Sequence, residues 1–166
     1  LGGVRYSISG AASLPSRIIE PWEARTGGML VEGYGLTETS PVLTINPLDD
    51  TRRAGTIGLP LPDTQLRIGD PHDLSRTQPD GEAGEILARG PQVFSGYLAD
   101  APATAAAFHD GWFRTGDMGV REPDGHIRLV GRIKEIIITG GFNVYPGEVE
   151  EALTSHPDIA QAAVVG

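Results

Sequence analysis

Glycine and proline constrain this chain more than any other residue types. The 166 residues include 23 glycines and 13 prolines, which recur along the whole sequence. Glycine permits, and proline enforces, backbone conformations that end helices and strands. We therefore expect short elements joined by many turns. No apolar run approaches the roughly 18 residues that a membrane-spanning helix requires, and the sequence shows no internal repeat.

The first third of the chain alternates between strand and helix patterns. Residues 4–8 alternate in polarity with a period of two, which predicts a strand. Residues 15–25 have helical spacing, with Ser13 as the expected N-cap. The apolar face of this helix would consist of Ile18, Ile19 and Trp22. A second short strand, 29–31, then runs into a loop at 32–35, a layout typical of an α/β sheet with a ligand-binding loop.

From about residue 55 the strand patterns become shorter and are separated by turns. Strands are expected at 65–68 and 85–89, and again at 118–121 and 126–130. Each pair flanks a Pro-Asp-Gly sequence, in which proline presets φ, aspartate bonds nearby backbone and glycine accepts positive φ. A short Ala-rich helix is expected at 102–108, opened by a proline. This stretch reads as a small antiparallel β-subdomain.

A third unit follows, with a strand at 135–138, a turn at 140–141, a helix at 146–155 and a strand at 159–165. The fold class predicted is therefore α+β. We divide it into 1–54, the end of a large α/β domain; 55–131, a β-subdomain of that domain; and 132–166, the start of a small αβ C-terminal domain. Because the chain starts at Leu1 and stops inside a predicted strand, we expect it to be a piece of a larger protein.

Composition excludes several kinds of site. The net charge of −9 argues against nucleic acid as a general partner, although it allows a nucleotide in one local pocket. Without cysteine there is no disulfide, thiolate metal site or cysteine nucleophile. The four histidines lack zinc-like spacing. The sequence also contains no G-x-S-x-G, G-x-x-x-x-G-K-[ST] or helix-opening G-x-G-x-x-G motif.

Several short segments carry residue types suited to a phosphorylated ligand. In residues 32–39, glycine allows close backbone approach, tyrosine can lie against a flat ring, threonine can donate to a phosphate and glutamate can hold Mg²⁺. Asp117 follows a glycine and could accept both hydroxyls of a ribose. Each segment also has a purely local explanation: a turn and helix cap at 32–39, an Asx-turn at Asp117, a tight turn at 9–12 and solvated charge at 131–135.

The order of these segments decides between the two explanations. Ser-Gly-Ala-Ala at 9–12, Tyr-Gly-Leu-Thr-Glu at 34–38, Gly-Trp-Phe-Arg-Thr-Gly-Asp at 111–117, Gly-Arg-Ile-Lys-Glu at 131–135 and Gly-Gly-Phe-Asn-Val-Tyr-Pro-Gly-Glu at 140–148 occur in succession. Together they resemble the adenylate-forming (AMP-binding) superfamily of acyl-CoA synthetases, adenylation domains and luciferases. Segments 32–38 and 141–146 look closest to the long-chain fatty acyl-CoA ligases. That family activates a carboxylic acid with ATP as an acyl-adenylate and transfers the acyl group to the thiol of CoA or a carrier protein.

The resemblance implies a role for each matching residue. The adenine would be surrounded by Gly10, Ala11, Gly33, Tyr34 and Gly35. Thr37 would contact phosphate, Glu38 would hold Mg²⁺, and Asp117 and Arg132 would bind the ribose. Lys134 would be the hinge between the large and small domains, and Asn143 would face the nucleotide phosphate. Gly140 and Gly141 would line the tunnel by which the CoA thiol enters. Thr37, Glu38 and Lys134 form the implied catalytic set, which acts through positioning and charge neutralisation.

The chain departs from the family pattern in three places. The family's Ser/Thr/Gly-rich phosphate loop lies upstream of these segments, and its adenylation lysine lies downstream. Position 138 holds isoleucine where some relatives have a lysine. We therefore expect the isolated chain to be inactive and the activity to belong to a parent protein that is cytoplasmic or peripheral to a membrane. The partners expected for that parent are ATP, Mg²⁺, a carboxylic acid of the fatty-acid class and CoA. Neither nucleic acid nor a transmembrane segment is expected.

Two alternatives remain from the sequence. One is an adenylation domain that loads a carrier protein instead of CoA. The other is a degenerate, non-catalytic nucleotide-binding module that kept the fold. The presence of Thr37, Glu38, Asp117 and Arg132 argues against the degenerate module, because drift would not be expected to spare all four.

Overall fold

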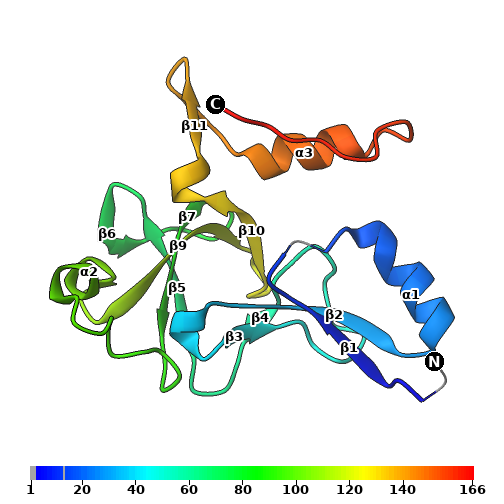
Figure 1. Ribbon diagram of the computed structural model, residues 1–166, viewed down its shortest axis with the longest axis horizontal. Helices are drawn as coiled ribbons and strands as arrows, with labels where there is room; N and C mark the ends of the chain where they lie inside the picture. The colour runs from blue at the N-terminus through cyan, green and yellow to red at the C-terminus, as the bar shows by residue number, and fades with distance from the viewer. Residues whose placement is uncertain (1–2, 13) are drawn as a thin grey trace.

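The computed structural model describes residues 3–12 and 14–166, and three β-sheets with three short α-helices make up its architecture (Figure 1). This confirms the predicted α+β class. The predicted cap at Ser13 lies outside the described residues. The first sheet spans the N-terminal third, the second holds the middle of the chain, and the third is a single hairpin near the C-terminus.

The first sheet has four strands in the order β1-β2-β3-β4. They are β1 (Tyr6–Ser9), β2 (Met29–Gly35), β3 (Val42–Ile45) and β4 (Leu59–Pro60). β1 and β2 run parallel and the other pairs antiparallel. The loop predicted at 32–35 is wrong, because β2 continues through Gly35 by pairing with β3. A 3₁₀ turn, η2 (Thr37–Thr39), then connects β2 to β3.

A helical crossover joins the two parallel strands, as such pairs require. It consists of η1 (Ser16–Ile18) and α1 (Ile19–Thr26). Pro21 fits within the first turn of α1, where a missing N–H removes no intrahelical bond. The predicted apolar face is only partly right: Ile19 is 7% exposed, but Ile18 and Trp22 are 42% and 38% exposed. The α-helix begins only at Ile19, so Ile18 belongs to the 3₁₀ turn and lies outside the face that packs on the sheet.

The loop between β3 and β4 is held by buried polar groups. The side-chain amide of fully buried Asn46 donates to Glu32 Oε2 (3.0 Å) and to the carbonyls of Arg53 and Thr56. Glu32 Oε1 accepts from the Gly55 backbone N–H at 2.8 Å. Glu32, the first residue of the 32–39 segment, is therefore a structural residue here.

The second sheet has six strands, all antiparallel, in the order β10-β9-β7-β5-β6 with β8 beside β9. They are β5 (Gln65–Asp70), β6 (Asp73–Thr77), β7 (Ala83–Arg89), β8 (Phe108–His109), β9 (Trp112–Arg121) and β10 (Ile127–Arg132). Both Pro-Asp-Gly turns are confirmed, with Gly81 and Gly125 at φ +89° and +91°. The sequence did not predict β6 or β8, and β9 begins well before the expected 118, so Asp117 lies within a strand.

The short helix of the middle segment is α2 (Ala101–Ala106), close to the predicted 102–108. Its proline lies in the first turn, as expected. The Asp100 carboxylate accepts from the Ala103 backbone N–H at 2.9 Å and so caps the helix, a role that the sequence reasoning missed.

The C-terminal unit begins with the 3₁₀ turn η3 (Ile133–Glu135). The hairpin β11 (Ile137–Thr139) and β12 (Phe142–Val144) follows, and then α3 (Pro146–Thr154). The hairpin projects away from the two larger sheets (Figure 1). Its turn at Gly140 and Gly141 is confirmed, with φ values of +58° and +83°. The strand predicted at 135–138 corresponds to β11, which begins two residues later than predicted because η3 occupies residues 133–135. The sequence did not predict β12.

The predicted strand at 159–165 is wrong. None of these residues pairs with another strand among those that the structure describes. An apolar run forms a strand only where a neighbouring strand completes its hydrogen-bond ladder. Here the Val164 backbone N–H donates instead to the Glu150 carboxylate of α3, at 2.9 Å.

Three buried clusters hold the units together. Ile57, Ile68, Ile86 and Ile127 form one, and Leu43, Ala88 and Phe113 form another. Tyr34 of β2 packs against both, so it joins the first sheet to the second. The third cluster, Met118, Val120 and Val130, receives Ile136 and Tyr145 from the C-terminal unit. The domain boundaries at 54/55 and 131/132 stay predictions.

Candidate nucleotide site

Three predicted ligand-binding residues from three strands meet in the structure. The Tyr34 hydroxyl on β2 donates to Asp117 Oδ2 on β9 at 2.6 Å. Arg132, the last residue of β10, places its Nε 3.2 Å from Asp117 Oδ1. Asp117 and Arg132 are register partners on neighbouring antiparallel strands, which explains why residues 15 apart in sequence are in contact. Asp117 is 3% exposed, whereas the Arg132 side chain is 64% exposed.

A bulge in β9 presents Asp117 at this position. The pairing of β7 with β9 shifts register between Glu85 and Leu87, opposite residues 115–117. Gly116 adopts φ +73° there, and the Asp117 N–H donates to Thr115 Oγ1 at 3.1 Å. Bulges commonly redirect one side chain near a functional site. Residues 115–117 therefore form a bulge in β9, and not the Asx-turn that was the local explanation for Asp117.

An ion pair between buried Glu85 and partly exposed Arg114 supports the bulge from β7. Glu85 is 2% exposed, and its Oε1 accepts from the Gly116 backbone N–H at 3.2 Å. Its Oε2 accepts from Arg114, with the closest nitrogen at 3.0 Å. Sequence reasoning missed this pair, although a glutamate inside an otherwise apolar strand was a signal that could have indicated it.

The environment of the cluster determines the protonation of both oxygen groups. Burial raises the pKa of Asp117, while the hydrogen bond from Tyr34 and the charge of Arg132 act in the opposite direction. Burial, together with the charge of Asp117, raises the pKa of Tyr34 well above its usual value, so the phenol stays a donor. A carboxylate has about four acceptor sites, and Tyr34 and Arg132 each use one. Asp117 therefore has about two acceptor sites that neither Tyr34 nor Arg132 uses.

The predicted adenine-binding residues lie side by side at the ends of β1 and β2. Parallel pairing brings Ser9 opposite Glu32, so Gly10 and Ala11 follow directly beside Gly33. A Cβ at Gly10 would lie 3.2 Å from the Gly33 carbonyl oxygen, and one at Gly35 would overlap the carbonyl oxygen of Pro41. Close backbone packing thus accounts for these two glycines, and the adenine contacts stay a prediction.

Thr37 and Glu38 lie on η2, which is fixed from both sides. Thr39 bonds the backbone of Leu36 and Pro41, which sets the turn. The Glu38 carbonyl accepts from the Phe94 N–H at 2.8 Å, and Glu38 Oε1 accepts from the Tyr97 hydroxyl at 3.0 Å. This hydrogen bond is the main cause of a raised pKa for Tyr97. Sequence reasoning missed Tyr97 as the partner of Glu38.

The residues around Glu38 are compatible with Mg²⁺ held partly by a nucleotide. No group of three or more His, Asp or Glu side chains suited to a metal occurs among residues 3–12 and 14–166. Mg²⁺ usually binds through one or two carboxylates together with substrate phosphates and water. One half-buried carboxylate next to a threonine hydroxyl fits that pattern, with Glu38 as the protein ligand.

The remaining predicted residues lie on the C-terminal unit. Lys134 is exposed on η3, two residues after Arg132. Asn143 on β12 is the register partner of Ile138, whose side chain is 75% exposed. Gly140 and Gly141 form the tip of the hairpin. The structure thus gathers Tyr34, Asp117 and Arg132 into one cluster and places Asn143, Gly140 and Gly141 on a separate projection.

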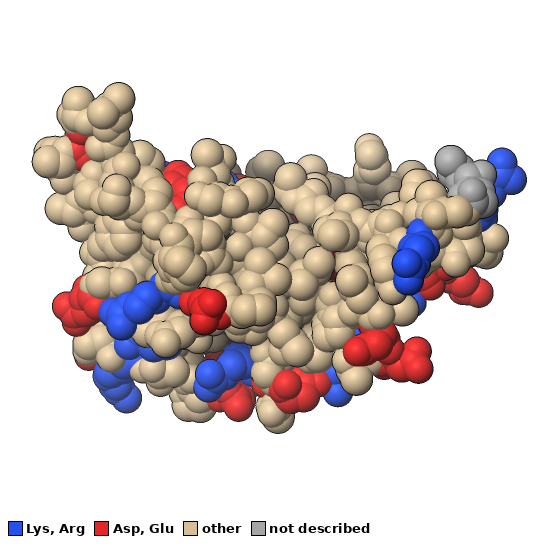
Figure 2. Space-filling view, turned by 90° about the horizontal axis from the view of Figure 1, so that it is seen from below, with Lys and Arg blue, Asp and Glu red and all other residues tan. Residues whose placement is uncertain are grey.

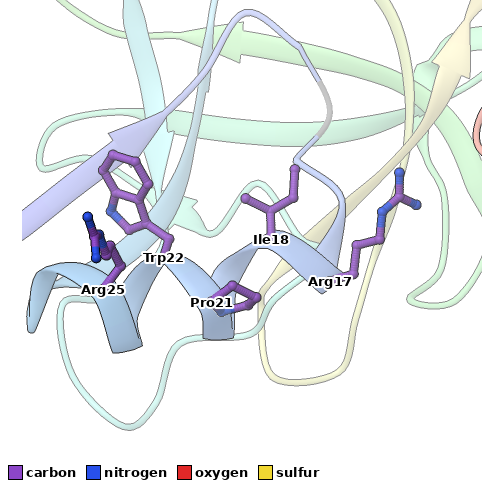
Figure 3. Close-up of a pocket in the computed structure, with 5 residues that line it drawn as sticks. All are labelled: Arg17, Ile18, Pro21, Trp22 and Arg25. Atoms are coloured by element: carbon purple, nitrogen blue, oxygen red, sulfur yellow. The ribbon is translucent and has the colours of Figure 1, made fainter.

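A hollow elsewhere on the surface does not involve any predicted site residue. Its volume is about 370 Å³, and its lining comes entirely from η1 and α1 (Figure 3). The lining residues are Arg17, Ile18, Pro21, Trp22 and Arg25.

On the face shown in Figure 2, basic and acidic side chains are interspersed, and much of the surface carries neither. No helix of the described residues is long and apolar enough to cross a membrane.

A family model described as AMP-binding enzyme matches residues 1–98, which include the β1, β2 and η2 segments. The chain belongs to the AMP-binding enzyme family. The predicted resemblance is thereby confirmed.

Relatives within the AMP-binding family extend the match over the full chain. A long-chain-fatty-acid–CoA ligase of Yersinia pestis is 43% identical over 98% of this chain and 29% of its own length. An indoleacetate–CoA ligase of Aromatoleum aromaticum is 45% identical over 100% of this chain and 32% of its own. ATP-bound MatB from Rhodopseudomonas palustris superposes with a TM-score of 0.89 at 41% identity, over 96% of this chain and 31% of that protein. The chain thus spans about a third of the length of these relatives.

Proposed function

We propose that this chain is part of an ATP-dependent acyl-CoA ligase that activates a carboxylic acid as an acyl-adenylate and transfers it to CoA. The observation that supports this most directly is the buried Asp117 carboxylate, held between Tyr34 and Arg132 in a member of the AMP-binding family. The parent would act in the cytoplasm or at a membrane surface.

The residues of the cluster would bind and orient the nucleotide. Asp117 would accept the ribose hydroxyls, with Arg132 beside it, and Tyr34 would place its ring against the adenine, next to Gly10, Ala11, Gly33 and Gly35. Thr37 would donate to a phosphate oxygen. Attack of a carboxylate on the α-phosphate needs little covalent help, so positioning and charge stabilisation account for most of the catalysis.

Glu38 is the residue that would hold Mg²⁺. The ion would neutralise charge on the phosphate oxygens when it is bound. The hydrogen bond from Tyr97 keeps the Glu38 carboxylate in place before any ligand arrives. Glu38 is also attached through its backbone to Phe94, so η2 has little freedom to move.

The C-terminal unit would serve the second half-reaction. Lys134 would be the hinge, Gly140 and Gly141 would line the path of the CoA thiol, and Asn143 would face the nucleotide phosphate. The exposed hairpin tip suits a role that depends on movement of the whole unit. We infer that the 166 residues alone are inactive, because the phosphate loop and the adenylation lysine of the family lie in other segments.

We propose a fatty acid as the substrate because segments 32–38 and 141–146 look closest to the long-chain ligases. The identities of 43% to the long-chain-fatty-acid ligase and 45% to the indoleacetate ligase are nearly equal, so an acid panel is needed.

The test uses the full-length protein. Acid-dependent exchange of pyrophosphate into ATP should be greatest with long-chain fatty acids, and acyl-CoA should form when CoA is added. Exchange with acyl transfer only to a carrier protein would support the adenylation-domain alternative. Absence of exchange with every acid, in a folded protein that binds AMP, would support the degenerate module. Exchange by the isolated 166 residues would contradict their proposed inactivity.

A further inference from the structure

The hydrogen bond between Tyr34 and Asp117 joins two sheets across 83 residues of sequence. Tyr34 is half-buried and packs against both the Ile57–Ile68–Ile86–Ile127 cluster and the Leu43–Ala88–Phe113 cluster. A ring that packs against the branched and aromatic side chains of two clusters has few alternative rotamers. The position of its hydroxyl is therefore set by the core, independently of any ligand.

The Asp117 carboxylate needs such a partner more than most side chains do. Its terminal torsion joins an sp³ to an sp² carbon, and such torsions have broad, shallow minima. Arg132 contacts the other oxygen, but its side chain is 64% exposed. Arg132 also lies directly before the exposed turn η3. Of the two partners, Tyr34 is the one that the core fixes.

We propose that the Tyr34 hydroxyl is a positioning group for the Asp117 carboxylate and thereby determines how well the ribose hydroxyls of an adenine nucleotide are recognised. This rests on the proposed function. It assigns Tyr34 a second task, separate from any contact of its ring with adenine: the hydroxyl acts through Asp117, without touching the nucleotide.

The test compares two nucleotides on Tyr34→Phe in the full-length protein. The variant keeps the ring and removes only the hydroxyl. Calorimetry measures binding of AMP and of 2′,3′-dideoxy-AMP, which lacks both hydroxyls that Asp117 would accept. Tyr34→Phe should weaken AMP binding roughly tenfold, the effect of losing one hydrogen bond to a charged group. Binding of dideoxy-AMP should change less than about twofold on the same scale. Equal weakening of both nucleotides would overturn the proposal.

Two further variants separate this proposal from the function on which it rests. Asp117→Asn should also weaken AMP more than dideoxy-AMP; equal weakening there would overturn the ribose assignment itself. Selectivity in Asp117→Asn without selectivity in Tyr34→Phe would overturn only the positioning role. Tyr97→Phe is the matched control, because it removes another tyrosine hydroxyl that donates to a carboxylate, that of Glu38. Its ratio of AMP to dideoxy-AMP affinity should equal that of the parent protein.

A pH series provides a readout that simple loosening of the core would not move. Asp117 is faced by Tyr34 from β2, Arg132 from β10, Glu135 from η3 and Glu85 from β7. The hydrogen bond from Tyr34 lowers the pKa of Asp117 against the effect of burial. Tyr34→Phe should raise that pKa, so AMP affinity should begin to fall at a higher pH as the solution is acidified. An acid limb at the same pH in both proteins would count against the positioning role.

Discussion

Two junctions connect the three units of this molecule, and they are built differently. At the first junction, Tyr34 and Leu43 of the first sheet pack among buried residues of the second, and the Tyr34–Asp117 hydrogen bond crosses the contact. At the second junction, residues 132–136 link the second sheet to the C-terminal unit through exposed η3, with partly buried Ile136 and Tyr145 on Val130 and Met118.

The difference matches the division of proposed roles. Most of the residues proposed to bind nucleotide and metal, including Tyr34, Glu38 and Asp117, lie near the first junction, on elements that the core fixes. Arg132 lies where the second junction begins, and Asn143 lies beyond it. The residues proposed for movement and thiol entry, Lys134, Gly140 and Gly141, lie at or beyond the second junction, where burial is lower. Binding requires preorganised groups, whereas a domain closure concentrates its backbone changes in a few boundary residues. Variants at the first and at the second junction test whether the two differ in packing and in function.

The largest expected effect is on stability at the first junction. Leu43 is fully buried, so Leu43→Ala should lower the free energy of unfolding by about 2–5 kcal/mol. The matched variant at the second junction is Ile136→Ala, which removes a partly buried side chain and should cost less than about 2 kcal/mol. Denaturant unfolding of the two full-length variants measures both values. Equal losses would mean that the two junctions are packed alike.

Next in size is the effect of Glu38→Gln on adenylation. The amide keeps an acceptor for the Tyr97 hydroxyl but removes the charge, and losing a charge-assisted contact costs roughly 1.5–3 kcal/mol, or ten- to a hundredfold in rate. Pyrophosphate exchange should fall by that factor and require more Mg²⁺. Tyr97→Phe retains the charge and should reduce the rate less. A Mg²⁺ series identical to that of the parent protein would remove Glu38 from the metal site.

Much of this architecture could be predicted because its signals are local. The two Pro-Asp-Gly turns, the Gly140-Gly141 turn and the first-turn proline of α2 each depend on the conformational limits of adjacent residues. The short strands β4, β8 and β12 were missed because two or three residues are too few to show a period. The segment 159–165 shows the opposite error, since its apolar pattern predicts a strand, yet it pairs with no other strand in the part of the chain that the structure describes.

The residues of the candidate site likewise include some that the sequence could predict and some that it could not. Ordered motifs were enough to identify Tyr34, Asp117 and Arg132, and the structure brings these three together. A glutamate in an apolar strand could mark Glu85, but its partner could not be predicted, because Glu85 and Arg114 are 29 positions apart. The same holds for Tyr97, which contacts Glu38 from 59 positions away. Such contacts depend on strand order and register, which no short motif contains.

A smaller and more selective effect is expected at Lys134. Lys134 lies within the 3₁₀ turn η3, and the φ of about −50 to −70° that is typical of such turns is close to the φ that proline fixes. Lys134→Pro should therefore hold the conformation seen here and slow one half-reaction about tenfold or more, near 1.4 kcal/mol, while sparing the other. Lys134→Gln, which leaves the torsions free, should leave both nearly intact. Equal loss of both half-reactions in folded Lys134→Pro would reject the hinge.

The smallest effect should come from the ion pair that crosses the second junction. Arg128 of β10 lies 3.6 Å from Glu148 of α3, and the two side chains are 43% and 53% exposed. Arg128 also lies 3.6 Å from Glu122, so it keeps a partner when Glu148 is removed. Exposed pairs of this kind contribute about 0–1 kcal/mol, and added salt screens them. A double-mutant cycle with Arg128→Gln and Glu148→Gln should give a coupling energy below about 0.5 kcal/mol. A coupling well above about 1 kcal/mol that persists in high salt would show that electrostatics fixes the C-terminal unit. The second junction would then be held as firmly as the first.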